Sequence, residues 1–131
     1  MFDNTFEYIF SPREGTQAAD MSEHFIDPAI VSDRFDRLKI VVEHSALIKH
    51  EARIGRIEEV VVQGPSRRNP NVYSGRTRQY KLVHFSSDVA LRPGTYTTVE
   101  ITKAAPHFLT GFLVEVLQMA THKIRIPVVS V

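Results

Sequence analysis

The chain contains no cysteine and no tryptophan among its 131 residues. Without cysteine it can form no disulfide bond, and it cannot bind zinc or an iron–sulfur cluster through thiolates. It also lacks any apolar run near the roughly 18 residues that a membrane span needs. Its first residues have neither the basic nor the apolar region of a secretory signal. We therefore expect a soluble, cytoplasmic protein without a membrane partner.

Residues that could perform catalysis or bind a metal show no useful spacing either. His44 and His50 are six residues apart, which would put them on different faces of a helix, and no His-x3-His pair exists. The serines have no nucleophile-elbow context, and the acidic residues form no recognisable acid–base pair. The sequence thus predicts no catalytic residue and no metal ligand.

Charge is distributed unevenly, although the formal net charge is only +1. Residues 1–52 carry 5 basic and 10 acidic side chains, a net of −5, whereas residues 53–131 carry 11 and 5, a net of +6. This switch suggests two modules with different partners. Only the basic half is suited to a polyanion.

The acidic half reads as a short strand, a polar linker and a long helix. Phe6, Tyr8 and Phe10 alternate along a strand-like segment that ends at Ser11-Pro12. Asp27-Pro28 is a helix N-cap followed by proline at the first helical position, and it predicts a helix of about 24 residues.

One face of this helix is apolar, because Val31, Phe35, Leu38 and Val42 recur at helical spacing. Core packing within its own domain is the simpler interpretation of that face. The alternative is a protein-interaction module, in which the acidic amphipathic helix, residues 27–51, binds a partner or a second copy.

The basic half is rich in strands separated by glycine and proline. Strands are expected at 56–63, 75–85, 95–102 and 111–117. Gly64-Pro65 should end the first of them. The fold class is therefore α+β and mainly β: a small antiparallel OB-like β-barrel, preceded by a strand/loop remnant and one long helix.

An ordered set of residues in this half forms a pattern over about 60 positions. The set comprises Gly55, Val60-Val61-Val62, Gly64-Pro65-Ser66, Gly75-Arg76-Thr77, Val83, Phe85, Val99-Glu100-Ile101-Thr102, Ala104, Pro106, Leu109 and Gly111. It resembles the TRAM domain at the C-terminus of the MiaB-type tRNA methylthiotransferases.

The N-terminal part resembles the same family separately. The segment Phe10-Ser11-Pro12-Arg13-Glu14-Gly15-Thr16 is similar to the motif after the last barrel strand of the family's radical-SAM domain, although Phe10 and Glu14 depart from the usual Tyr and Pro. The resemblance implies four parts: the end of a radical-SAM barrel over 1–26, a linker helix over 27–53, a TRAM domain over 54–118 and a tail over 119–131. It also implies that Arg13 lies near a cofactor or substrate in the whole protein, and that residues 1–26 alone pack poorly or are rebuilt.

The resemblance implies a function in tRNA modification. The family adds a 2-methylthio group to N6-isopentenyladenosine beside the anticodon, using [4Fe-4S] clusters and S-adenosylmethionine. Since this chain lacks every cluster cysteine, it should bind no such cofactor and should be inactive alone. A complete enzyme with an unrecognised site remains an alternative. The expected partner is the anticodon region of tRNA, not DNA.

Basic residues of the barrel are the candidates for binding that RNA, because arginine and lysine position phosphates on OB-like surfaces. The predicted RNA-binding residues are Arg67, Arg68, Arg76, Arg78, Lys81, Arg56, Lys103 and Tyr80. The four arginines at 67, 68, 76 and 78 are expected to lie close together. Tyr73 and Tyr80 could stack on bases.

Overall fold

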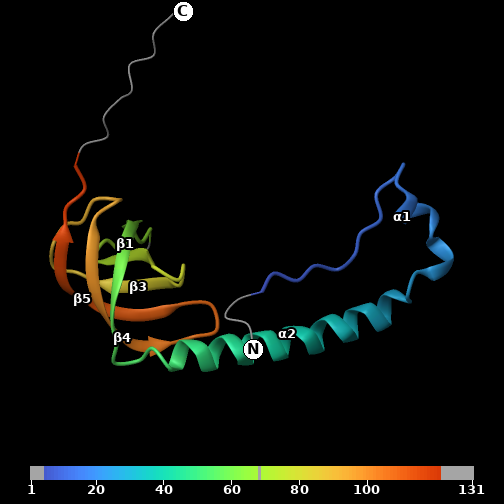
Figure 1. Ribbon diagram of the computed structural model, residues 1–131, viewed down its shortest axis with the longest axis horizontal. Coiled ribbons are helices and arrows are strands. Elements are labelled where there is room, and N and C mark those ends of the chain that lie inside the picture. The colour runs from blue at the N-terminus through green and yellow to red at the C-terminus, as the bar shows by residue number, and fades with distance from the viewer. Residues whose placement is uncertain (1–4, 68, 122–131) are drawn as a thin grey trace, which may run out of the picture. The chain divides into compact units, whose positions relative to one another are not determined.

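The structure is a computed structural model that describes residues 5–67 and 69–121. It divides the chain into two compact units, Met1–Lys49 and His50–Val131. The first contains most of the helical structure and the second contains all of the strands (Figure 1).

The first unit begins without the predicted strand, because residues 5–10 belong to no strand. Phe6 and Tyr8 are 81% and 85% exposed. A lone strand has no backbone partner to stabilise it, so the alternating pattern is not sufficient here. The segment continues into α1 (Gln17–Asp20) and the short 3-10 helix η1 (Ser22–His24). The expectation that residues 1–26 pack poorly or are rebuilt stays a prediction.

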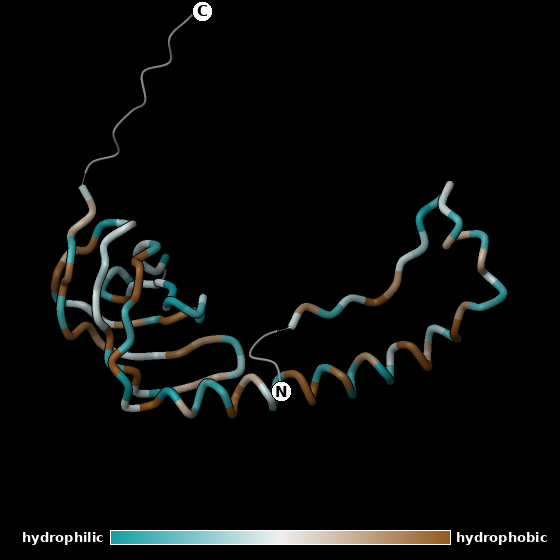
Figure 2. Tube along the Cα trace, in the orientation of Figure 1, coloured by the Kyte–Doolittle hydropathy of each residue, from teal (hydrophilic) through white to brown (hydrophobic). Residues whose placement is uncertain are grey.

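The long helix α2 spans Pro28–Glu51, so its 24 residues fall within the expected 27–53. Asp27 caps it: its Oδ1 accepts a hydrogen bond from the backbone N–H of Ala29 at 2.8 Å. Figure 2 shows that hydrophobic residues recur along the whole helix, between hydrophilic ones. On the predicted apolar face, Val31 is half-buried whereas Leu38 is 48% exposed.

The second unit is a closed barrel of five strands in the order β1-β2-β3-β5-β4 (Figure 1). The strands are β1 (Ile57–Pro65), β2 (Val72–Thr77), β3 (Leu82–Ser86), β4 (Tyr96–Ala104) and β5 (Leu109–Gln118). All neighbouring pairs are antiparallel except β3 and β5, which close the barrel in parallel. The predicted small barrel is confirmed, with this one parallel seam.

The barrel interior is filled by the inward residues of each strand. Alternate side chains of a strand point to one face, so a single parity supplies the core. The core residues are Val60, Val62, Tyr73, Val83, Phe85, Leu91, Val99, Ile101 and Leu109. Gly75 and Gly111 continue this parity where there is no room for a side chain. A Cβ at Gly75 would meet Val60, and one at Gly111 would meet the carbonyl oxygen of Glu100.

Two strand boundaries differ from the sequence-based expectation. The expected strand 75–85 is two strands, since a turn at 78–81 is closed by the Tyr80 N–H donating to the Thr77 carbonyl at 2.9 Å. Conversely, β1 does not end at Gly64. A bulge between Val62 and Gly64 lets it continue to Pro65, which still faces Tyr73 of β2. A bulge accommodates glycine and proline because one residue leaves the ladder.

Candidate nucleic-acid interface

The predicted arginines that the structure describes lie at two different ends of the barrel. β1 and β2 run antiparallel, with Val60 facing Thr77 and Pro65 facing Tyr73. The turn at 78–81 therefore lies beside the start of β1, and the connection at 66–71 follows its end. Five residue steps along β2 separate these ends by about 17 Å, at roughly 3.3 Å per residue. Arg67 therefore lies away from Arg76 and Arg78, and the expectation that these arginines lie close together is wrong for the three that the structure describes.

The larger group lies at the start of β1, and we name it the basic end. It consists of Arg56, Arg76, Arg78, Lys103 and Tyr80. The Arg56 carbonyl accepts from the Ile101 N–H at 2.9 Å, which places Arg56 beside β4, two residues from Lys103. Arg56, Arg78, Lys103 and Tyr80 are exposed, and Arg76 is half-buried. The fold thus brings five of the eight predicted residues to one end.

Arg78 is paired within the protein. Its Nε and Nη2 donate to the two carboxylate oxygens of Glu59 at 2.9 and 3.2 Å. The hydrogen bonds and charge of Glu59 raise the pKa of Arg78 above its ordinary value. Since the Arg78 side chain remains 73% exposed, a phosphate can reach it, but that phosphate must compete with Glu59.

Arg53 is a basic residue that the sequence reasoning missed. Its Nη1 donates to Glu58 at 2.7 Å and to Gln79 at 3.2 Å. The Arg53 and Glu58 side chains are each only 14% exposed. The ion pair with Glu58 joins the segment before β1 to β1 itself, and the hydrogen bond to Gln79 joins that segment to the turn at 78–81. The acidic pair Glu58-Glu59 was the sequence signal for this contact, because two adjacent carboxylates in a strand favour nearby arginine partners.

Arg76 and Tyr80 form a stacked pair. The guanidinium carbon of Arg76 lies 4.6 Å from the centroid of the Tyr80 ring. Nη1 of Arg76 also donates to the Tyr80 carbonyl at 3.3 Å. Tyr80 has φ = 62°, the left-handed conformation that a bulky residue rarely adopts. The two side chains are therefore held in one arrangement on the turn.

The remaining predicted residues do not belong to the basic end. Arg67 is exposed at the other end of the barrel, and Arg68 lies outside the described residues. Lys81 is only 5% exposed, too little for an open phosphate contact. Tyr73 is not a stacking residue, because it is 7% exposed in the core and its hydroxyl accepts from the Leu91 N–H at 3.2 Å.

The first unit offers an apolar cavity of about 810 Å³ instead of a basic surface. Phe10, Met21, Phe25 and Val31 contribute to its walls, and the rings of Phe10 and Phe25 lie edge to face at 5.6 Å. Arg13 does not line it: the side chain is exposed, and its carbonyl accepts from the Thr16 hydroxyl at 2.7 Å. This cavity can bury an apolar surface, and among the described residues it has no basic side chain at its wall besides His24.

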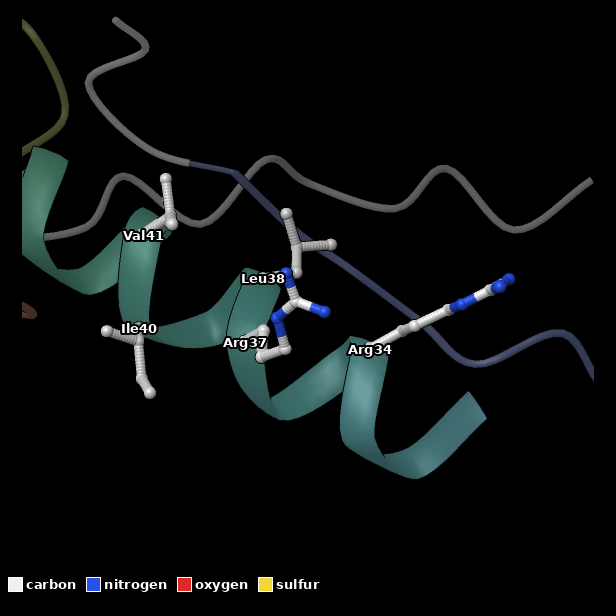
Figure 3. A pocket seen from close by; sticks show the side chains of 5 residues that line it. All are labelled: Arg34, Arg37, Leu38, Ile40 and Val41. Atoms are coloured by element: carbon white, nitrogen blue, oxygen red, sulfur yellow. The ribbon is translucent and has the colours of Figure 1, made fainter. Parts of the chain in front are cut away.

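A second, shallower hollow lies on α2, and all its lining residues come from that helix. Figure 3 shows Leu38 and Val41 pointing to one side of the helix and Ile40 to another, with Arg34 and Arg37 extending beside them. Ile40 and Val41 are 67% and 62% exposed. Because these apolar side chains are exposed, a protein interaction through α2 stays a candidate function.

Over residues 5–67 and 69–121, no group of three or more His, Cys, Asp or Glu residues could hold a metal ion. The whole sequence has no cysteine for an iron–sulfur cluster. None of the helices in the described part is long and apolar enough to cross a membrane.

Comparisons with known proteins agree with the fold. Residues 51–114 match the TRAM domain family. The chain is 40% identical over 114 residues to a tRNA-2-methylthio-N(6)-dimethylallyladenosine synthase of Moorella thermoacetica, covering 87% of the chain and 25% of the relative. A synthase of the same name from Geobacillus kaustophilus is 39% identical over 122 residues, covering 92% and 23%. The chain thus spans about a quarter of the length of these relatives.

Proposed function

Because the chain carries the TRAM domain of the MiaB-type tRNA methylthiotransferases, in a segment that matches their C-terminal part, we propose that its barrel binds tRNA through the basic end. TRAM domains are RNA-binding modules. The observation that carries the proposal is the convergence of Arg56, Arg76, Arg78 and Lys103 from two strands, a turn and the segment before β1. Cations grouped in this way, three of them exposed and Arg76 half-buried, suit the spaced phosphates of an RNA backbone.

We propose that the tRNA region bound is the anticodon stem-loop; the name of the relatives describes a modified adenosine of tRNA. In the whole protein, the barrel would hold this region while a radical-SAM domain adds the methylthio group to N6-isopentenyladenosine. The iron–sulfur clusters and S-adenosylmethionine would belong to that domain, since this chain has no thiolate ligand. We infer that the chain alone binds tRNA without modifying it, in the cytoplasm.

The same proposal assigns a role to each of the four parts inferred from the sequence. Residues 1–26 would be the end of the radical-SAM domain, with the apolar cavity around Phe10 and Phe25 covered by the rest of that domain. Arg13 would then face its cofactor or substrate. Residues 27–53 would be the linker helix, 54–118 the TRAM domain and 119–131 a tail.

A charge-reversal series tests the proposal. Arg56→Glu/Lys103→Glu changes two exposed cations that have no ion-pair partner among the described residues, so folding should not change. We expect tRNA affinity to fall about tenfold or more, because two phosphate contacts are lost and two repulsions are added. Arg34→Glu in α2 is the matched control and should bind like the unchanged protein. Equal affinity for all three proteins would refute the basic end as the binding site.

The exposed apolar residues of α2 favour a second candidate, a protein interaction through this helix. Leu38 and Val41 point to one side of the helix (Figure 3) and are 48% and 62% exposed, and exposed apolar side chains that lie together mark interaction surfaces. Light scattering at high concentration separates the two functions. Self-association that Leu38→Glu/Val41→Glu abolishes, without any change in tRNA binding, would support an additional interaction surface.

A further inference from the structure

Tyr80 occupies a position that its side chain makes unfavourable. Among the described residues, it is the only non-glycine residue with positive φ, at 62°. Glycine or asparagine usually fills such a turn position, because a Cβ crowds the backbone there. Here a large aromatic ring occupies it, and the ring is 72% exposed. Hydrophobic burial therefore does not explain the tyrosine.

The turn nevertheless holds this ring in one place. The Tyr80 N–H donates to the Thr77 carbonyl at 2.9 Å, and the Thr77 N–H donates to the Lys81 carbonyl at 3.0 Å. Arg76 stacks on the ring itself at 4.6 Å, and its hydrogen bond to the Tyr80 carbonyl holds the backbone of the same residue. The guanidinium covers one face of the ring, and the exposure of the residue leaves the other face open to solvent.

We propose that the open face of Tyr80 stacks an unpaired nucleobase of the bound RNA. This inference rests on the proposed function and adds a base contact to its phosphate contacts. A base needs a flat aromatic surface, and a ring already held in place loses little freedom when it binds. Arg76 completes the stack on the far side of the ring. Arg78, two residues before Tyr80, is exposed and would contact a phosphate of the same strand.

The proposal predicts a preference between forms of RNA. A base in a duplex is already stacked on its neighbours and cannot lie on Tyr80, whereas a base in a loop can be splayed out. Loss of one base–aromatic stack weakens binding by about 5- to 150-fold. The effect should be confined to RNA with unpaired bases, since the phosphate contacts serve both forms equally.

The test compares three variants of the whole 131-residue chain. Tyr80→Gly removes the ring and suits the left-handed backbone, so its melting temperature should be at least that of the unchanged protein. Tyr80→Phe keeps the ring. Tyr8→Gly removes an equally exposed ring from the other unit. Binding is measured on an RNA hairpin with a single-stranded loop, which carries 2-aminopurine, and on a duplex without a loop.

The expected result is that Tyr80→Gly binds the hairpin about tenfold or more weakly and no longer quenches 2-aminopurine fluorescence. Its affinity for the duplex should be unchanged, and Tyr80→Phe and Tyr8→Gly should bind both RNAs like the unchanged protein. Unchanged hairpin binding by Tyr80→Gly, or an equal loss on hairpin and duplex, would overturn base stacking while leaving the proposed RNA binding intact. Failure of the unchanged protein to bind either RNA would instead refute the proposed function.

Discussion

The contact between β4 and β5 at Gly111 gives the sharpest stability prediction. Gly111 faces Ile101 across the ladder, and a Cβ there would collide with the carbonyl oxygen of Glu100 and lie 2.8 Å from Cγ1 of Val99. Neither atom can move away easily, because one is strand backbone and the other belongs to a fully buried side chain. Gly111→Ala must therefore separate the two strands.

Overpacking of this kind costs about 1–3 kcal/mol, and each backbone hydrogen bond lost with it adds about 1 kcal/mol. We expect Gly111→Ala to lower the free energy of unfolding by about 3 kcal/mol. For a barrel of this size that corresponds to a fall in melting temperature of roughly 12–24 °C. Thermal unfolding followed by circular dichroism measures it.

Gly55→Ala is the matched control, because no atom lies within 4 Å of the place that a Cβ would take there, and only its φ of +80° opposes alanine. The left-handed backbone conformation costs alanine about 1–2 kcal/mol, so the control should melt clearly above Gly111→Ala. A Gly111→Ala protein that melts within about 2 °C of the unchanged chain would refute the tight β4–β5 contact.

Three further predictions follow from individual contacts. Glu59→Gln removes the carboxylate that competes for Arg78, and should tighten tRNA binding about two- to fivefold in a filter-binding assay; weaker binding would contradict that competition. Arg53→Met leaves the poorly exposed Glu58 without its partner and should cost about 2 kcal/mol in urea unfolding, whereas no change would mean that the pair is dispensable. Asp27→Ala removes the cap of α2 and should cost about 1 kcal/mol of helix stability, seen as less helical signal on heating; an identical melting profile would argue against the cap.

Local signals in the sequence were sufficient for the long helix and for the presence of a barrel. Asp27-Pro28 marked the start of α2, because a cap and a first-turn proline act within a few residues. Valine, threonine and isoleucine between glycine and proline marked β1 and β4, because β-branched residues suit strands. The alternation at Phe6 and Tyr8 gave a wrong prediction, since a strand also needs a partner that this segment lacks among the described residues.

The arrangement of the basic residues depended on long-range pairing, which no local pattern contains. Arg67 and Arg78 are only eleven positions apart in the sequence, yet β2 separates them because a turn at each of its ends reverses the chain. The pairing of Arg78 with Glu59 depends on the register of β1 against β2, which a bulge at Gly64 shifts. The left-handed backbone of Tyr80 had no sequence signal, because tyrosine is an unusual residue there.

The central claim is that the basic end binds RNA phosphates, and the salt dependence of tRNA binding tests it most directly. If Arg56, Arg76, Arg78 and Lys103 each contact one phosphate, the logarithm of the association constant should fall linearly with the logarithm of salt concentration, with a slope of about −3. The Arg56→Glu/Lys103→Glu variant should show a slope about 1.4 units shallower. Absence of tRNA binding at low salt, or a slope that this variant leaves unchanged, would contradict the account.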